Sequence, residues 1–543
     1  MAQVVLDNQD IRRRKSSMVG RDNGTTDCCI HALLASQQKR ALEEAAGQIA
    51  ADNFGGPQRL NTIPEPKDND KDKDETDKLE HREEGHSSAH PDHERLSKVI
   101  DRKQAASHER KDDTDEYGER RVTHSRMLTK KQLSDMAWGV REISKRLGSV
   151  KMRLKVQDVF LLTKAHDQSL IGNTREVAKW LLSPDRRVRY RVWVEDKLKD
   201  SKTFNTKGLI EDMEKEYKQK EISDNDDKGR PLQKRLRYWT NELCRTKPHT
   251  FDFVVTLGGD GTVLYASWLF QRIVPPVLSF ALGSLGFLTK FDYDNFPETL
   301  TRAFRDGIRV SLRLRFEGTV MRAQNRRRKE SADSTDTEEH EESAKRDLVE
   351  ELVGEEQGDE RTHKPDGTFE ILNDIVVDRG PNPSKYFMLK YLTRLTILAM
   401  SAIEIFGDDE HFTSLQADGV CVATPTGSTA YNLAAGGSLC HPENPVILVS
   451  AICAHTLSFR PIILPDTIVL RIGVPYDARA SSWASFDGRE RVELQPGDYV
   501  TISASRYPFA NVMQHGRRSE DWVNSISGKL GWNTRQKQKS FDD

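Results

Sequence analysis

The chain has 543 residues, of which 36% are hydrophobic and 31% are charged, and its formal net charge is −2. This nearly neutral balance gives the whole chain no electrostatic reason to bind nucleic acid. The sequence holds no apolar run of membrane-spanning length and no apolar leader region, so we expect a cytoplasmic protein with no nucleic-acid and no membrane partner. The six cysteines include no CxxC pair, and we predict no protein-bound metal site.

Two stretches hold too few apolar residues to form a core. They run from Pro64 to Arg120 and from Arg322 to Gly367. Burial there cannot offset the roughly 1–2 kcal/mol per residue of backbone entropy that folding costs. We therefore predict a disordered regulatory arm over residues 1–127 and a disordered acidic insert over 322–367. The rest of the chain is enough for two ordinary domains.

Helical and strand patterns alternate between residues 128 and 306. Apolar runs predict strands, and apolar residues at helical spacing predict the helices that separate them. This alternation is typical of a Rossmann-like, doubly wound α/β domain with ligands at the carboxyl ends of its strands. The predicted strands lie within 156–164, 189–195, 251–257 and 275–281, and the predicted helices within 130–148, 169–183, 232–244, 262–271 and 295–307.

Short strands broken by Gly, Pro and Asp follow from residue 307. The pattern favours an antiparallel β-rich domain over residues 307–510, after the α/β domain. The polar insert at 322–367 would lie between two of its strands. Residues 511–543 would form a C-terminal tail.

The sharpest motif is the glycine turn Gly258–Gly261, directly after an apolar strand and before a predicted helix. Glycines let the backbone approach a bulky anion, and the free amides at the helix start face a phosphate. Asp260 within this turn would repel phosphate, so its presence points to cation binding or to removal of a proton from an attacking hydroxyl. The alternative is a tight turn in which Asp260 caps the helix.

A second glycine turn, LGSLGFL over Leu282–Leu288, follows the next predicted strand. Neighbouring strand ends of a doubly wound sheet share one crevice, so we expect both glycine turns to line a single cleft. A plain chain reversal is the alternative for this second motif.

A third motif, DGVCVATPTGSTAYN, spans residues 418–432. It predicts a turn in which the hydroxyls of Thr426, Ser428 and Thr429 cap the following helix, while the ring of Tyr431 stacks on a ligand. A core helix is the alternative, although so many small residues and hydroxyls would be costly there.

Two polar residues, Asn373 and Asp374, interrupt an apolar strand pattern in ILNDIVVDRG. Adjacent strand positions would direct their side chains to opposite faces. Asn373 can both donate and accept hydrogen bonds, as recognition of an amide or adenine edge requires, and Asp374 can accept from two ribose hydroxyls. Ordinary polar strand residues are the alternative.

Taken together, the motifs resemble those of the NAD kinases, in particular the fungal members. Two further segments support the resemblance, CAHTLSFRPIILP over 453–465 and SFDGRER over 485–491, and the similarity covers roughly residues 128–510. It implies transfer of the ATP γ-phosphate to the 2′-hydroxyl of the NAD adenosine ribose, with Mg²⁺ accompanying ATP. It also implies a homo-oligomer.

The resemblance assigns roles to individual residues. Asp260 would be the general base and Gly261 a phosphate contact, while Asn373, Asp374 and Asp418 would bind the ribose and amide groups of NAD. The remaining residues expected to line the nucleotide sites are Gly258, Gly259, Thr262, Gly283, Phe287, Thr426, Ser428, Thr429, Ala430, Tyr431 and Asn432.

Two other functions fit parts of this pattern: a lipid or sphingoid kinase of related fold, and a non-catalytic NAD(P)-binding regulator. The chain also departs from the family between Pro383 and Met400, where one Thr of the family pattern is replaced by SKYFMLKYLTRLTILA. Because its codons can form splice signals, our hypothesis is that residues 384–399 are a translated intron. Sequencing the mature transcript and finding these 16 codons in it would contradict this hypothesis.

Overall fold

The computed structural model describes residues 124–164, 167–222, 231–283, 285–324, 346–353, 362–380, 400–456, 458–514 and 520–531, together with the backbone of 5–6. The predicted arm, apart from those two residues and 124–127, lies outside the described residues, as does the anomalous segment 384–399. No helix in the described part of the chain is long and apolar enough to cross a membrane.

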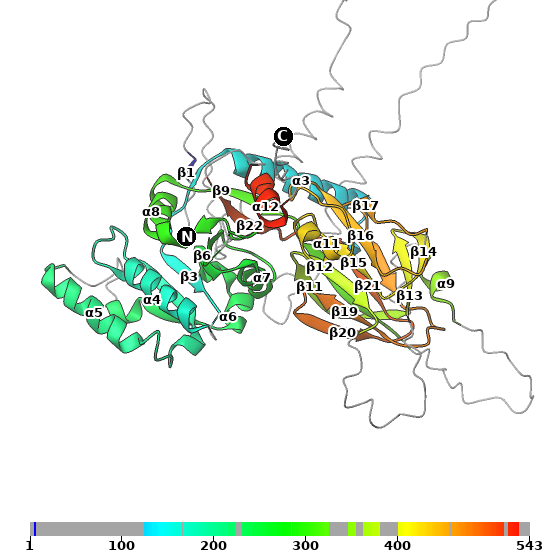
Figure 1. Ribbon diagram of the computed structural model, residues 1–543, viewed down its shortest axis with the longest axis horizontal. Coiled ribbons are helices and arrows are strands. Elements are labelled where there is room, and N and C mark those ends of the chain that lie inside the picture. Colours follow the sequence, from blue (N-terminus) through cyan, green and yellow to red (C-terminus); the bar gives the residue numbers. More distant parts are fainter. Residues whose placement is uncertain are drawn as a thin grey trace, which may run out of the picture. The chain divides into compact units, whose positions relative to one another are not determined.

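The first domain is built on a parallel sheet, as predicted (Figure 1). The chain enters at β3 (Asp158–Leu162), runs outward through β4 and β5 on one side, and then returns to place β6 and β7 on the other. The order in which the chain adds strands therefore reverses between β3 and β6. Doubly wound folds bind ligands at such a reversal point. The other parallel strands are β4 (Arg191–Glu195), β5 (Leu236–Trp239), β6 (Phe253–Gly258) and β7 (Val277–Ala281), and β8 (Phe291–Asp292) pairs with β7.

Both faces of this sheet are buried. Along β3, Val159 and Leu161 belong to one core cluster, while Phe160 and Leu162 belong to another on the opposite face. Helices contribute to both clusters, so the domain is doubly wound. These helices are α3 (Lys130–Ser149), α4 (Gln168–Leu182), α5 (Thr206–Gln219), α6 (Asn241–Thr246), α7 (Asp260–Leu269) and α8 (Phe296–Asp306).

The helix predicted over 232–244 was wrong. This segment forms β5 and then the short helix α6. Trp239 explains the difference, because its ring stacks on Phe160 at 4.6 Å between centroids and its indole N–H donates to the carbonyl of Leu161 (3.1 Å). Pairing with β4 therefore overrides the local helical spacing. Helix α5 was not predicted.

The second domain consists of two six-stranded antiparallel sheets, in the orders β11-β10-β21-β18-β13-β14 and β17-β16-β15-β12-β19-β20. Both sheets contribute to one apolar cluster, as expected for an antiparallel β-rich domain. Its strands are β10 (Phe316–Ala323), β11 (His363–Ile371), β12 (Asp374–Asp378), β13 (Ser401–Gly407), β14 (Glu410–Ala417), β15 (Gly419–Ala423), β16 (Val446–Ile452), β17 (Ile462–Pro465), β18 (Leu470–Gly473), β19 (Ser482–Phe486), β20 (Glu490–Leu494) and β21 (Tyr499–Ala504).

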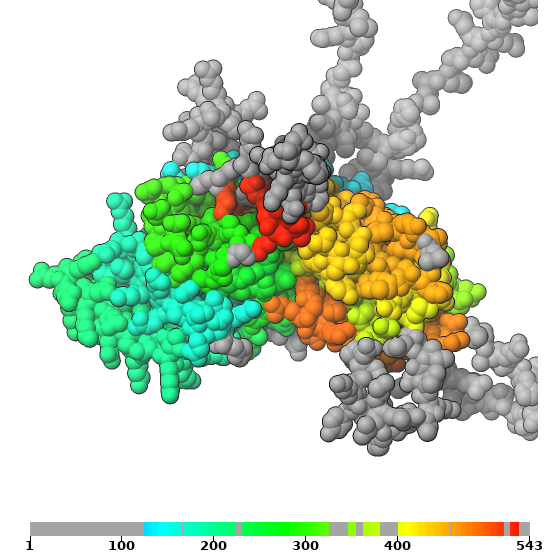
Figure 2. All heavy atoms as spheres, viewed as in Figure 1, coloured from blue at the N-terminus to red at the C-terminus, as the bar shows by residue number. Residues whose placement is uncertain are grey.

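Two segments differ from the predicted domain boundaries. Strands β9 (Arg309–Arg313) and β22 (Phe509–Met513) pair with each other in the α/β sheet, so the region predicted as a tail from residue 511 instead completes the first domain. Helix α12 (Glu520–Leu530) follows and lies on the boundary between the two domains in Figure 2.

The insert predicted as disordered over 322–367 is partly folded. Strands β10 and β11 extend into it, and helix α9 (Leu348–Leu352) buries Leu348 and Leu352 against Met321, Phe406 and Tyr499. These apolar residues are too few to predict a core from the sequence, because their partners lie on distant strands.

Candidate active site

The first glycine turn lies at the carboxyl end of β6, at the reversal point of the sheet. Gly258 has a φ of +151°, and a Cβ there would lie 2.4 Å from the hydroxyl oxygen of Thr262, so only glycine fits. Gly259 is the N-cap of α7 and Asp260 its first residue, with no side-chain capping bond. The alternative in which Asp260 caps the helix is therefore wrong.

The carboxylate of Asp260 binds the second glycine turn instead. It accepts hydrogen bonds from the backbone amides of Phe287 (2.8 Å), Leu288 (3.0 Å) and Thr289 (3.0 Å), and from the Thr289 hydroxyl (3.1 Å). A Cβ on Gly286 would lie 2.0 Å from an Asp260 carboxylate oxygen, so glycine allows this approach. The structure thus brings the two glycine turns together. Gly283 lies in the same turn, with a φ of +115°.

The Asn373 and Asp374 pair does not occupy adjacent strand positions as predicted. Asn373 lies in a bend after β11, and only Asp374 belongs to β12. The carboxylate of Asp487 holds this bend by accepting hydrogen bonds from the amides of Leu372 (2.9 Å), Asn373 (2.8 Å) and Asp374 (3.2 Å). Three amide donors on one carboxylate fix a turn where the sequence suggests continuous strand.

Asp374 is buried, with 8% of its surface exposed. Burial, followed by the neighbouring charge of Asp487, raises its pKa to about 7, and a hydrogen bond from the Tyr431 amide opposes that shift. The side chain can therefore change its charge near neutral pH, which is typical of functional carboxylates.

The TPTGST segment packs directly on this bend. The amide of Thr424 donates to the carbonyl of Asn373 (2.9 Å), and a Cβ on Gly427 would lie 2.2 Å from the same oxygen. The structure therefore brings the third motif and the Asn373-Asp374 bend together, although they are far apart in sequence.

The predicted capping by hydroxyls in this motif was wrong. Residues Thr426–Thr429 form a 3₁₀ helix themselves, and α11 (Tyr431–Ala434) begins without a side-chain cap. Ser428 is fully buried and exchanges hydrogen bonds with the backbone of Cys440.

Asn432 is also fully buried. Its amide donates to the carbonyls of Ser428 (3.3 Å) and Ser438 (3.1 Å) and accepts from the Ser450 hydroxyl (2.9 Å). These contacts hold the loop. The prediction that Ser428 and Asn432 also line the nucleotide site stays a prediction.

Four other residues of this motif have an unpartnered hydroxyl or some exposed surface that a ligand could contact. The Thr426 hydroxyl is buried and has no hydrogen-bond partner within the described residues. The Tyr431 side chain is 45% exposed, and Ala430 beside it is partly exposed. Thr429 is partly exposed as well, although its hydroxyl donates to the Thr426 carbonyl at 3.4 Å.

Asp418 lies away from this group. It precedes β15, whose register places Gly419 opposite Asp378 and Ala423 opposite Asp374. Asp418 is therefore at the other end of the strand, roughly 16 Å along it, and its carboxylate pairs with Arg379 (3.2 Å).

The two halves of the site meet through one hairpin turn that sequence analysis gave no role. Asp487 and Arg489 both lie in the β19–β20 turn, and the Arg489 guanidinium donates to the carbonyl of Gly261 (3.0 Å). The SFDGRER segment was noted only as part of the resemblance, and its polar turn between strands was the available signal.

No group of three or more His, Cys, Asp or Glu side chains able to hold a metal ion occurs among the described residues. The groups gathered here are amide, hydroxyl and guanidinium donors and single carboxylate acceptors.

Two family models match the chain: the ATP-NAD kinase N-terminal domain over residues 159–308 and the ATP-NAD kinase C-terminal domain over residues 390–514. The NAD(+) kinase of Saccharomyces cerevisiae is 42% identical over 76% of this chain, and the match spans 66% of that protein. The ATP-NADH kinase of the same yeast is 37% identical over 75% of this chain and 70% of its own length.

A solved structure, yeast NADH kinase complexed with NADH, is also similar. It matches 72% of this chain and 93% of its own, at 26% identity and a TM-score of 0.50. The fold and the motifs are thus those of a kinase that acts on a nucleotide, made of a doubly wound α/β domain and an antiparallel β domain.

The chain belongs to the NAD kinase family, as the resemblance implied. The comparisons give no support to a lipid kinase or to a non-catalytic regulator.

Proposed function

We propose that the chain transfers the γ-phosphate of ATP to the 2′-hydroxyl of the adenosine ribose of NAD, producing NADP. The observation that carries this proposal is the position of Asp260, at the start of α7 and at the reversal point of the sheet. Its carboxylate is held by amides and a hydroxyl, with no ion pair among the described residues. An acceptor carboxylate without a cationic partner suits proton removal from a hydroxyl.

The phosphates of ATP would lie at the two glycine turns. Gly259 and Gly261 leave open space where a Cβ would stand, and both adjoin the amino end of α7. A helix amino end attracts anions through its free amides and its dipole. Mg²⁺ would enter as part of the Mg·ATP substrate and neutralise the phosphates near Asp260.

The adenosine ribose of NAD would lie on the β domain. Asp374 would accept hydrogen bonds from the ribose hydroxyls. Asn373 would donate to and accept from an amide group of NAD, and Thr426 and Tyr431 would lie nearby. The unpartnered Thr426 hydroxyl supports this placement, because a buried polar atom without a partner is costly unless a ligand satisfies it.

Asp418 could reach this ligand only from a second copy of the chain or after a large rearrangement. The proposed homo-oligomer and cytoplasmic location are separate expectations.

The direct test is an assay of the purified full chain with Mg·ATP and either NAD or NADH, with products separated by chromatography. Wild-type protein should form NADP or NADPH, and the ratio of the two rates gives the acceptor preference. Asp260→Asn should lower kcat by about 10²–10⁴-fold, because the general base is lost.

Calorimetric titration should show NAD binding retained in this variant. Equal turnover by variant and wild type would contradict the role of Asp260. Phosphorylation of diacylglycerol in place of NAD would contradict the proposed substrate.

A further inference from the structure

The β19–β20 turn is rigid and faces two parts of the site at once. Asp487 and Gly488 have φ values of +49° and +64°, so both adopt the left-handed conformation of a tight hairpin turn. The Asp487 amide donates to the Asp374 carbonyl (3.0 Å), and the Arg489 amide donates to the Phe486 carbonyl (2.9 Å). The backbone from which the Asp487 and Arg489 side chains extend is thus held in one conformation.

On one side, this turn determines the position of the proposed acceptor bend. The Asp487 carboxylate accepts from three consecutive amides, those of Leu372, Asn373 and Asp374. Burial raises the pKa of Asp487, and these three amide hydrogen bonds oppose the shift. A movement of the turn would therefore move the bend with it.

On the other side, the turn contacts the helix that begins with Asp260. One terminal nitrogen of Arg489 donates to the Gly261 carbonyl (3.0 Å), and the guanidinium carbon lies 4.7 Å from the centre of the Tyr265 ring. Gly261 and Tyr265 are one helical turn apart on α7. Arg489 thus binds the first turn of α7 through the hydrogen bond to Gly261 and the following turn through the cation–π contact with Tyr265.

The other end of α7 is held independently of Arg489. Arg315, fully buried in the segment between β9 and β10, donates to the carbonyls of Phe270 and Arg272, each at 2.9 Å. Beyond the helix, the side-chain amide of Gln271 accepts from the Glu370 amide (2.9 Å) and donates to its carbonyl (3.4 Å). Loss of Arg489 should therefore leave α7 folded and docked but release its first turn.

We propose that Arg489 is a positioning residue for phosphoryl transfer, which ties the first turn of α7 to the acceptor bend through the rigid β19–β20 turn. This inference rests on the proposed kinase function. Transfer requires the base, the ribose hydroxyl and the γ-phosphate to be aligned, and a displacement of about 1 Å can cost as much as 10²-fold in rate. Arg489 sets the distance between Asp260 and Asp374, which lie in different domains.

The test compares Arg489→Ala, Arg489→Lys and the control Arg491→Ala in the full chain. Arg491 lies on the same hairpin, but its guanidinium binds Asp378 (3.1 Å to each carboxylate oxygen) and not α7. We expect Arg489→Ala to lower kcat about tenfold with KM for NAD changed less than about twofold. Arg489→Lys should recover part of kcat, because an ammonium group can still donate to the Gly261 carbonyl.

Hydrogen exchange measured by mass spectrometry supplies a readout that needs no turnover. The peptide covering residues 260–267 should exchange faster in Arg489→Ala than in wild type, and Arg491→Ala should match wild type. Turnover in Arg489→Ala equal to that of the control would overturn the proposal. A lowered kcat without faster exchange would also overturn it, because Arg489 would then act on substrate and not on α7.

A wild-type chain that makes neither NADP nor NADPH would refute the kinase function itself. The exchange comparison would still decide whether Arg489 holds the first turn of α7.

Discussion

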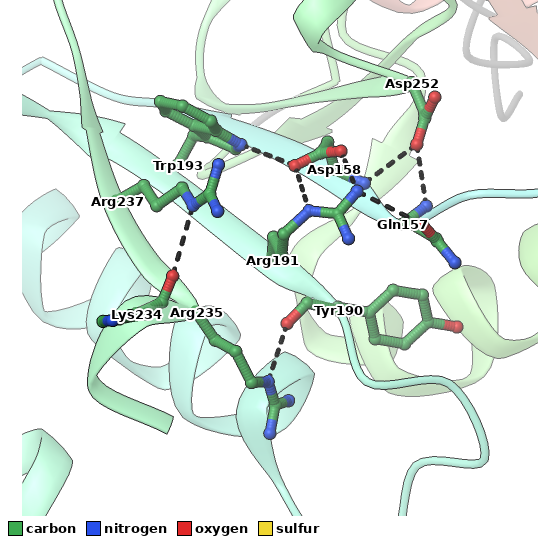
Figure 3. Close-up of polar contacts among 9 residues, drawn as sticks. All are labelled: Gln157, Asp158, Tyr190, Arg191, Trp193, Lys234, Arg235, Arg237 and Asp252. Carbon is green, nitrogen blue, oxygen red and sulfur yellow. Dashed lines mark hydrogen bonds and ion pairs between the residues drawn. The ribbon is translucent and has the colours of Figure 1, made fainter. Parts of the chain in front are cut away.

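The two edges of the parallel sheet use carboxylates in opposite ways. At the amino edge, shown in Figure 3, Asp158 binds the guanidinium of Arg191 through both oxygens, with one N–O distance of 2.7 Å, and accepts from the Trp193 indole (2.9 Å). At the carboxyl edge, Asp260 has amide and hydroxyl donors but no ion pair within the described residues. Neutralisation by arginine suits a structural role, and amide donors leave a negative charge available for chemistry.

Asp252 also stabilises the amino edge of the sheet. Its carboxylate accepts from the amides of Gln157 (2.8 Å) and Asp158 (2.9 Å), which joins the starts of β3 and β6 (Figure 3). Burial raises the pKa of Asp252, while these amide bonds lower it. Asp252 and Asp260 both accept hydrogen bonds from backbone amides, so the kind of partner does not separate them. Asp260 is the catalytic candidate because it lies at the carboxyl edge, between the two glycine turns.

Of the changes considered for the two edges, the largest expected loss of stability follows from a substitution at the amino edge. Asp158→Ala leaves Arg191 as a buried cation without its carboxylate, and such losses cost about 3–5 kcal/mol of unfolding free energy. The measurement is urea unfolding of the variant and of wild type. The folded variant should keep wild-type kcat, and a large loss of kcat in fully folded protein would break the distinction between the two edges.

A pH-dependent effect is expected for Asp374, whose pKa is raised to about 7 by burial and by Asp487. The unfolded aspartate ionises near pH 4, so the native state binds more protons between pH 4 and 7, and stability falls as pH rises through this window. Asp374→Asn stays neutral and should gain stability relative to wild type over the same window, by up to roughly 4 kcal/mol.

Urea midpoints at pH 5 and pH 8 measure this difference. A gap between variant and wild type that does not change with pH would mean that Asp374 does not titrate as described.

A smaller effect, this time on catalysis, is expected from Gly286→Ala. The added Cβ would lie 2.0 Å from an Asp260 oxygen and 2.5 Å from the Thr289 hydroxyl, so the carboxylate must move. We expect kcat to fall about 10²-fold. The control is Gly172→Ala in α4, where a Cβ meets nothing within 4 Å. Wild-type kcat in Gly286→Ala would show that the position of Asp260 is not critical.

The smallest effect is expected at Thr426. Thr426→Val removes a hydroxyl that has no partner in the described structure, so stability should change by less than about 1 kcal/mol. If NAD supplies the partner, KM for NAD should rise by up to about tenfold. Unchanged KM would remove Thr426 from the acceptor site.

Much of the fold could be predicted because its signals are local. The apolar runs at β3, β6 and β7 and the spacing in α3, α4 and α8 appear where the sequence indicates them. The pattern over 232–244 predicts one helix because four strand residues and a short helix together mimic helical spacing, and only pairing with β4 separates them. The sequence does not reveal that residues 511–513 form a strand, because their partners, β7 and β9, precede them by about 200 residues or more.

By itself, the sequence determined the doubly wound and antiparallel domain types, the glycine turns and the family to which the chain belongs. These features depend on residue periodicity and on short motifs whose backbone requirements are local. Only the tertiary structure decided which partners these polar residues have. Ser428 and Asn432 are buried in backbone contacts, Asp418 lies at the far end of a strand, and Asp487 and Arg489 join the two halves of the site.

The physical reason is that each of these assignments depends on a partner distant in sequence. A hydroxyl, amide or carboxylate can act on a ligand only where the fold leaves it both a free hydrogen-bonding position and room for the ligand.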